Sequence, residues 1–220
     1  MKITTPFIAA LLFVTGISSV NADTNFEAWK EKMIQDALTA APPSVTNDAT
    51  IHAWDESGKL LMIRHGRGVH NCVATGAFSY RIGLPKPPFP APKCFDQNAW
   101  AYFKALWAEK NPLKPSKPLP TAPGLVWMLA GMGVPDGMLN KGANSEAQLK
   151  VDSNGKKIAQ LSPHIMIMPL PVAGKKSTMP FNYDPDNPSQ TWLMAAGTAI
   201  EHVMLHVTNE DVRAMMGHSK

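Results

Sequence analysis

The sequence predicts a single α+β domain built on an antiparallel or mixed β-sheet, flanked by a few helices and long proline-rich loops. Three observations support this fold class. Short segments of alternating apolar residues, typical of strands, recur along the chain, and two other segments have apolar residues at helical spacing. Neither an internal repeat nor a break in composition divides the 220 residues. A chain of this length with 45% hydrophobic residues can bury one sizeable core.

The first 22 residues have the layout of a secretory signal peptide. Lys2 supplies a positively charged start, residues 7–14 are apolar, and Val-Asn-Ala at 20–22 matches a cleavage site of the A-x-A type. We therefore expect residues 1–22 to be removed, which leaves a mature domain of residues 23–220 in the periplasm or outside the cell. The apolar run is too short to span a membrane, so no span is expected after cleavage.

The elements of the N-terminal half follow from periodicity and from turn residues. Apolar residues at helical spacing over 26–38 predict an amphipathic helix that ends ahead of Pro42. Residues 50–54 and 59–65 are typical of two strands, joined by the turn residues Asp-Glu-Ser-Gly. Asp96 stands where it would cap a second helix, whose apolar face is expected to carry Trp100, Phe103, Leu106 and Trp107.

The C-terminal half is expected to consist mainly of strands and loops. A proline-rich linker is predicted over 113–123, and a glycine-rich surface loop reaches Gly142. Strands are predicted at 125–130, at 192–196, around His164 and around His202. Asn209 stands where it would cap a short last helix.

Cys72 and Cys94 are the only cysteines in the chain. In an oxidising compartment an isolated pair is more often a disulfide than a metal site. The proline- and glycine-rich segment between them would otherwise be loosely held, and closing a loop of that length stabilises a fold by about 3 kcal/mol. We therefore expect a structural disulfide between Cys72 and Cys94.

Two strand-like motifs near the C-terminus are the most informative part of the sequence. In residues 164–168 (His-Ile-Met-Ile-Met) and 202–206 (His-Val-Met-Leu-His), an aliphatic residue alternates with His or Met. Successive side chains of a strand point to opposite faces, so each strand has one face of imidazole and thioether groups. The candidate site residues on these faces are His164, Met166, His202, Met204 and His206.

This residue set suggests a copper site. Imidazole suits copper and zinc, whereas thioether sulfur selects copper, above all Cu(I). If the two strands are neighbours, their leading histidines could converge with the methionines, and His206 or Met168 could complete the coordination. The same pattern also fits an ordinary protein interior, because Met is apolar and fills irregular cores well. A copper or small-ligand site and a packed core are therefore both open interpretations at this point.

The order of these features resembles an uncharacterised family of exported bacterial proteins. The shared features are a Gly-rich turn before Cys72 and a proline-rich loop closed by Cys94, with Asp96 two places on. The motifs Met-Leu-x-Gly, Pro-His-Ile-Met and Gly-Thr…His-x-Met follow, beginning at residues 128, 163 and 197. The resemblance covers residues 41–207 and implies an exported protein without assigning it a reaction. Relatives often carry Pro at the position of His206.

A second functional alternative lies at residues 60–66 (Leu-Leu-Met-Ile-Arg-His-Gly). An apolar strand that ends in Arg-His-Gly resembles the start of the histidine phosphatase family. The resemblance implies a phosphomonoesterase in which His65 is the phosphorylated nucleophile and Arg64 binds the phosphate. The rest of that family's pattern does not follow, because a cysteine and a proline-rich loop come next.

Other function classes find no motif in the chain. Lysine and arginine are scattered and do not alternate with aromatic residues, so nucleic acid is not an expected partner despite a net charge of +4. The order Glu201-His202 does not match a His-Glu-x-x-His zinc motif, and no nucleophile elbow, Walker loop or dinucleotide fingerprint is present. A binding protein is favoured over an enzyme, and a structural or interaction component is the third alternative.

Overall fold

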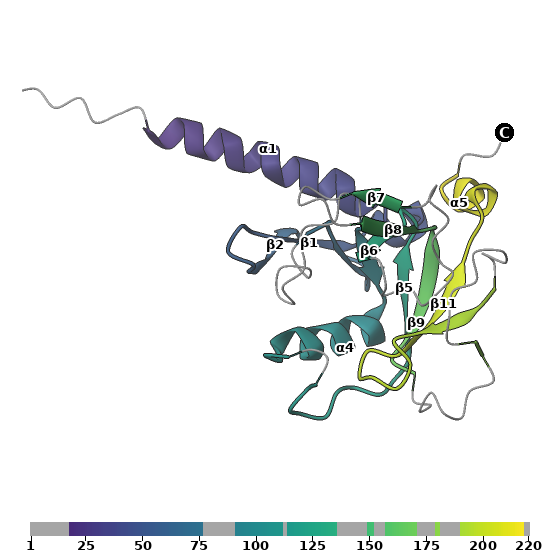
Figure 1. Cartoon of the computed structure of the whole chain (residues 1–220). Helices are drawn as coiled ribbons and strands as arrows, with labels where there is room; N and C mark the ends of the chain where they lie inside the picture. The colour runs from purple at the N-terminus through teal and green to yellow at the C-terminus, as the bar shows by residue number, and fades with distance from the viewer. Residues whose placement is uncertain are drawn as a thin grey trace, which may run out of the picture.

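A computed structural model of the chain describes residues 18–76, 91–111, 114–135, 149–151, 157–170, 179–180 and 190–217. Its main feature is an eight-stranded mixed sheet that carries helices on both faces (Figure 1). The described residues also form a three-stranded sheet. The predicted α+β class is confirmed.

The large sheet has the strand order β10-β11-β9-β5-β4-β3-β1-β2. Its strands are β1 (Thr50–Trp54), β2 (Leu60–Arg64), β3 (Asn71–Val73), β4 (Lys93–Phe95), β5 (Gly124–Met128), β9 (His164–Met168), β10 (Trp192–Met194) and β11 (His202–His206). Neighbouring strands are antiparallel except for β1 and β3, which are parallel. The small sheet contains β6 (Met132–Pro135), β7 (Leu149–Val151) and β8 (Lys157–Leu161). The helices in the described residues are α1 (Ser18–Leu38), α2 (Pro43–Thr46), α4 (Gln97–Ala108) and α5 (Asn209–Met215).

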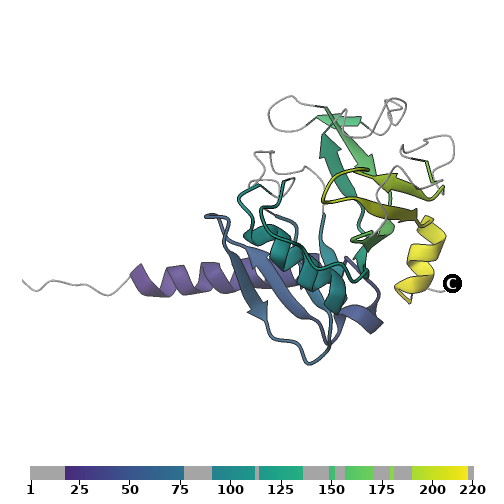
Figure 2. The same cartoon turned by 90° about the horizontal axis from the view of Figure 1, so that it is seen from below.

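The two faces of the large sheet are covered by different helices. α4 packs on one face, where its Phe103 and Trp107 meet Phe95 of β4 in an aromatic cluster. The C-terminal part of α1 covers the other face over β1, β2 and β3, where small residues such as Ala37 and Ala53 are fully buried. Figure 1 shows the two helices on opposite sides of β1. Figures 1 and 2 both show the N-terminal part of α1 extending beyond the sheet.

Helix α1 is longer than the segment predicted from periodicity. It begins at Ser18, passes through the expected cleavage point after Ala22, and ends at Leu38, ahead of Pro42 as predicted. Residues 1–17 lie outside the described residues, so removal of the signal peptide stays a prediction. None of the helices in the described ranges is long and apolar enough to cross a membrane.

Helix α4 begins as the sequence predicts, because Asp96 caps it. One oxygen of its carboxylate, Oδ1, accepts a hydrogen bond from the backbone N–H of Ala99 at 2.8 Å. The other oxygen, Oδ2, accepts from the N–H of Leu125 at 2.8 Å. One side chain therefore caps the helix and also holds it against the start of β5.

Cys72 and Cys94 form the predicted disulfide. They are register partners in β3 and β4, and both side chains are fully buried in the small-residue core under α1. The bond therefore fastens two neighbouring strands in addition to closing the intervening loop. Residues 77–90 of that loop lie outside the described residues.

The strands of the C-terminal half differ from the predictions in three places. β5 ends at Met128 instead of residue 130, and it is fully buried only at alternate positions, with Leu125 38% exposed. The segment expected to form a glycine-rich loop begins with β6, and its remainder up to Gly142 lies outside the described residues. β10 is only three residues long, because Ala195 adopts a positive φ of 55° that ends the strand.

The last helix is capped by a different residue from the one predicted. Thr208, one residue before Asn209, accepts a hydrogen bond from the backbone N–H of Asp211, and the Asp211 carboxylate accepts one from the N–H of Thr208. This reciprocal pair is a capping box, in which two otherwise unsatisfied N–H groups find acceptors. Asn209 is therefore the first helical residue instead of the cap.

Candidate functional site

The two His- and Met-containing strands, β9 and β11, are neighbours in the large sheet. His164 is the register partner of His206, and Met166 is the partner of Met204. Continuing this register by one residue places Met168 opposite His202. The sheet face that we call the His/Met face consists of His164, Met166, Met168, Met194, His202, Met204 and His206. It belongs to the side of the sheet on which α4 packs.

His202 lies among thioether side chains. Met194 of β10 is its register partner on one side, and Met168 of β9 is its neighbour on the other. Met204 comes next on the same face of β11. The Cβ atoms of directly opposite residues lie about 5 Å apart, within reach of flexible Met side chains. Because His202 is only 7% exposed and Met168 and Met204 are buried, this neighbourhood is largely closed to water.

The ring of His202 is held in one tautomer. Its Nδ1–H donates a hydrogen bond to the carbonyl oxygen of Ile200 at 2.6 Å, which leaves a lone pair on Nε2. That Nε2 is buried and has no hydrogen-bond partner among the described residues. Burial lowers the pKa of His202, and the carboxylate of Glu201 opposes this effect. His202 is therefore a neutral imidazole with an unused lone pair in sulfur-rich surroundings.

His164 has the same tautomer in a different environment. Its Nδ1–H donates to the carbonyl oxygen of Ser162 at 2.7 Å, and its buried Nε2 also has no hydrogen-bond partner in the described part of the chain. Its register partners are Met128 of β5 and His206 of β11. The pKa of His164 is lowered to about 3, mainly by burial; the hydrogen bond to the Ser162 carbonyl opposes this effect, and the charges of His206, His202 and Lys93 add to it.

Both ring nitrogens of His206 are engaged. The indole N–H of Trp192 donates to Nε2 at 2.9 Å, and the hydroxyl of Ser162 lies 2.7 Å from Nδ1. Because an indole N–H only donates, Nε2 must accept and Nδ1 must carry the proton. His206 in this tautomer does not offer a lone pair to an ion and is not a base for the Ser162 hydroxyl. Burial lowers the pKa of His206 to about 4.

The strand register separates the two histidines that were expected to converge. His202 lies four residues from His206, the partner of His164, which is about 13 Å along the strands. The register therefore places His206, and not His202, directly opposite His164. Within the described ranges, no group of three or more His, Cys, Asp or Glu residues could hold a metal ion. The neighbours of His202 are thioethers instead.

Sequence reasoning missed several neighbours of these histidines. Met128 and Trp192 lie on the flanking strands, and Ser162 accepts hydrogen bonds from both His164 and His206. The alternation of Trp192 with Met194 was a signal for a shared face. No comparable signal existed for Met128, because its place beside His164 depends on strand order.

The Arg-His-Gly segment has a structural role at the end of β2. The Arg64 guanidinium, through Nη2, donates to the carbonyl oxygens of Thr46 at 2.7 Å and Ala49 at 3.1 Å. A Cβ atom on Gly66 would come within 2.2 Å of the Asp48 carbonyl oxygen, so the glycine permits a close backbone approach. His65 is exposed, and no contact in the described residues joins it to another histidine or an arginine. Nothing in this geometry favours a phosphate site.

Comparisons with protein-family models, with curated proteins and with solved structures found no match to the chain. The resemblances to exported bacterial proteins and to histidine phosphatases therefore stay predictions. Any functional conclusion depends on the geometry of the chain itself.

Proposed function

We propose that this chain is an exported protein that binds Cu(I), a soft monovalent cation, through His202 and the thioethers of Met168, Met194 and Met204. The observation that carries the proposal is the buried Nε2 of His202, which has no hydrogen-bond partner among the described residues. Buried polar atoms without a partner cost free energy, so they often mark a function. One imidazole with several thioethers is a donor set that suits Cu(I).

The backbone around His202 supports the same proposal. A metal-binding histidine usually donates its second ring N–H to a carbonyl or carboxylate, which fixes the tautomer and the ring orientation. The hydrogen bond from Nδ1 to the Ile200 carbonyl oxygen is of this kind. His202 would therefore offer its lone pair without rearrangement, and the methionines would adjust to the ion because their side chains are flexible.

Electrostatics favour His202 over His164 as the ligand. Glu201 is buried beside His202 and contributes a negative charge that stabilises a cation there. Positive charge from Lys93 acts on His164 and disfavours a second cation nearby. One Cu(I) per chain is the expected stoichiometry.

The direct test is an anaerobic titration of the mature protein with Cu(I) against a coloured Cu(I) chelator. We expect the wild type to bind one equivalent and His202→Leu to lose about 100-fold or more in affinity, since even residues that only support a ligand contribute 10–100-fold. His65→Leu is the matched control, because that histidine is exposed and does not contact the site. Equal affinities of the wild type and His202→Leu would mean that the His/Met face is only a packed core.

Export has its own test. If residues 1–22 are a signal peptide, protein isolated from the periplasm of an expressing bacterium begins at Asp23. Intact-mass measurement reads this directly, and full-length protein found in the cytoplasm would contradict export. This outcome is independent of whether the chain binds copper.

A further inference from the structure

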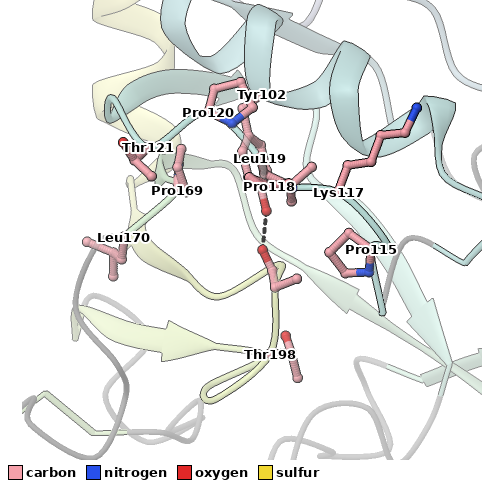
Figure 3. Close-up of a pocket in the computed structure, with 11 residues that line it drawn as sticks. Tyr102, Pro115, Lys117, Pro118, Leu119, Pro120, Thr121, Pro169, Leu170 and Thr198 are labelled. Atoms are coloured by element: carbon pink, nitrogen blue, oxygen red, sulfur yellow. Dashed lines mark hydrogen bonds between the residues drawn. The ribbon is translucent and has the colours of Figure 1, made fainter.

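A pocket of about 340 Å³ lies at the end of the sheet where the His202 end of the His/Met face is located. Three segments line it: the proline-rich segment that follows α4, the residues after β9, and the loop before β11. Its lining includes Pro115, Pro118, Pro120, Pro169, Thr121 and Thr198. Figure 3 shows these residues around the hydrogen bond from the Tyr102 hydroxyl to the backbone carbonyl of the loop before β11.

The wall made by the proline-rich segment is stiff and fixed in place. Proline rings restrict backbone rotation at three of its positions. The carboxylate of Glu109 at the end of α4 accepts hydrogen bonds from both the backbone N–H and the hydroxyl of Ser116, at 2.8 and 2.7 Å. This wall of the pocket is therefore fixed in place by α4.

The pocket and the proposed copper site share two backbone segments. Pro169, which lines the pocket, directly follows Met168. The carbonyl of Ala199 accepts the Tyr102 hydroxyl, and the next residue, Ile200, supplies the carbonyl that holds the His202 ring. Tyr102 packs in the same core cluster as Met168 and Met204. The pocket lining therefore adjoins, along the chain, both Met168 of β9 and residues 200–202, which lead into β11.

The lining is uncharged toward the pocket interior. Lys117 is exposed, and Figure 3 shows its amine pointing away from the other lining residues. What remains is proline rings, aliphatic groups and threonine hydroxyls. Since a liquid water occupies about 30 Å³, the volume holds roughly ten waters, or an ion with one or two small ligands.

We infer that this pocket is the entry port through which Cu(I), carried by small organic ligands, reaches the buried His202. The inference rests on the proposed function, because it presumes that His202 binds the ion. Tyr102 and the loop before β11 form the barrier between port and site. Filling the port therefore slows entry and exit equally and leaves the equilibrium affinity unchanged.

The test is stopped-flow mixing of the mature protein with Cu(I) supplied as its acetonitrile complex, followed by tryptophan fluorescence. Trp192, the register partner of Met204, is the expected reporter. Thr121→Trp fills the pocket from the proline-rich wall, and Leu170→Trp fills it from the opposite side. Ala122→Trp is the matched control, because Ala122 is exposed, adjoins Thr121 and does not line the pocket.

We expect each filled variant to show association and dissociation rates lowered by about tenfold, with equal Kd and an unchanged near-UV circular dichroism spectrum. If the pocket-filling variants have the same rates as Ala122→Trp, the pocket is not the entry port, although the copper site itself would still stand. A weaker Kd with an unchanged association rate would also overturn the entry port, because the pocket would then only support the site. Absence of copper binding by the wild type would remove the proposed function and the port together.

Discussion

The two ends of the His/Met face contain the same kind of residue in different surroundings. His164 and His202 each begin a strand with the pattern His-x-Met, each donates Nδ1–H to a carbonyl two residues earlier, and each has a buried Nε2 without a hydrogen-bond partner in the described residues. His164 lies near the amine of Lys93 and the engaged His206, whereas His202 lies beside Glu201 and three thioethers.

This difference shows that neighbouring strands decide what a buried imidazole can do. Of the residues that separate the two cases, Lys93 is far from both histidines in the sequence, and Met194 comes from the strand before that of His202. The same His-x-Met pattern therefore gives a pH-sensitive core residue, His164, at one end of the face and a candidate ligand, His202, at the other. The predictions below test that contrast from its largest expected effect to its smallest.

The largest effect should be acid destabilisation through His164. The pKa of this group is about 3 in the folded protein and about 6.5 in the unfolded chain. As pH falls below 6.5, the unfolded chain binds a proton that the folded state excludes, so the free energy of unfolding should drop by several kcal/mol between pH 6.5 and pH 3. Chemical denaturation of the metal-free protein over this range measures it.

The matched variants for this titration are His164→Leu and His65→Leu. Removing His164 should make the decline in unfolding free energy shallower, whereas changing the exposed His65 should not. The remaining decline should come from His202 and His206, because burial also lowers their pKa values. A decline of equal slope in both variants would show that other groups cause the acid sensitivity.

The next effect concerns Lys93. If its charge is what keeps a cation away from His164, Lys93→Met should let the chain bind a second equivalent of Cu(I), at about tenfold weaker affinity or better. Adding His164→Leu to that variant should restore a stoichiometry of one. The chelator titration measures the number of Cu(I) equivalents bound by each variant. A single equivalent bound by Lys93→Met would mean that the charge of Lys93 does not distinguish His164 from His202.

A smaller effect is expected from the thioethers. Met168→Leu preserves volume but removes a sulfur donor, so Cu(I) affinity should fall about tenfold with little change in stability. Met128→Leu makes the same substitution beside His164 and should leave affinity unchanged. Equal losses in the two variants would contradict a site centred on His202.

The smallest effect is expected from Glu201. Glu201→Gln keeps an oxygen that can accept the hydrogen bond from Gly197 N–H, now 2.6 Å long, but removes the charge. Cu(I) affinity should fall about threefold, with the association rate less affected than the dissociation rate. An unchanged Kd would show that the thioethers and His202 alone account for binding.

Much of the fold followed from local sequence. The β1–β2 hairpin, the Asp96 cap and the Cys72–Cys94 disulfide were all predicted, because turn residues, capping residues and isolated cysteine pairs act locally or have few alternatives. The choice between Thr208 and Asn209 as a cap was not resolved, since both residue types cap helices and they are adjacent.

The candidate site was less predictable than the strands that carry it. Alternation places His and Met on one face of each strand, but it does not set the register between strands. That register puts His206, not His202, opposite His164, and so divides one expected site into two neighbourhoods. The small sheet was missed altogether, because β7 and β8 lie among polar and glycine-rich segments that resemble loops.

The turn at Gly131 connects the large sheet to the small sheet. Its φ of 75° turns the chain from β5 into β6, and a Cβ there would lie 2.5 Å from the carbonyl oxygen of Leu161, next to Ser162. The paired strands β5 and β9 of the large sheet therefore continue, beyond this turn, as the paired strands β6 and β8 of the small sheet. The small sheet is therefore connected through Ser162 to His164 and His206, since the Ser162 carbonyl accepts a hydrogen bond from His164 and its hydroxyl contacts His206.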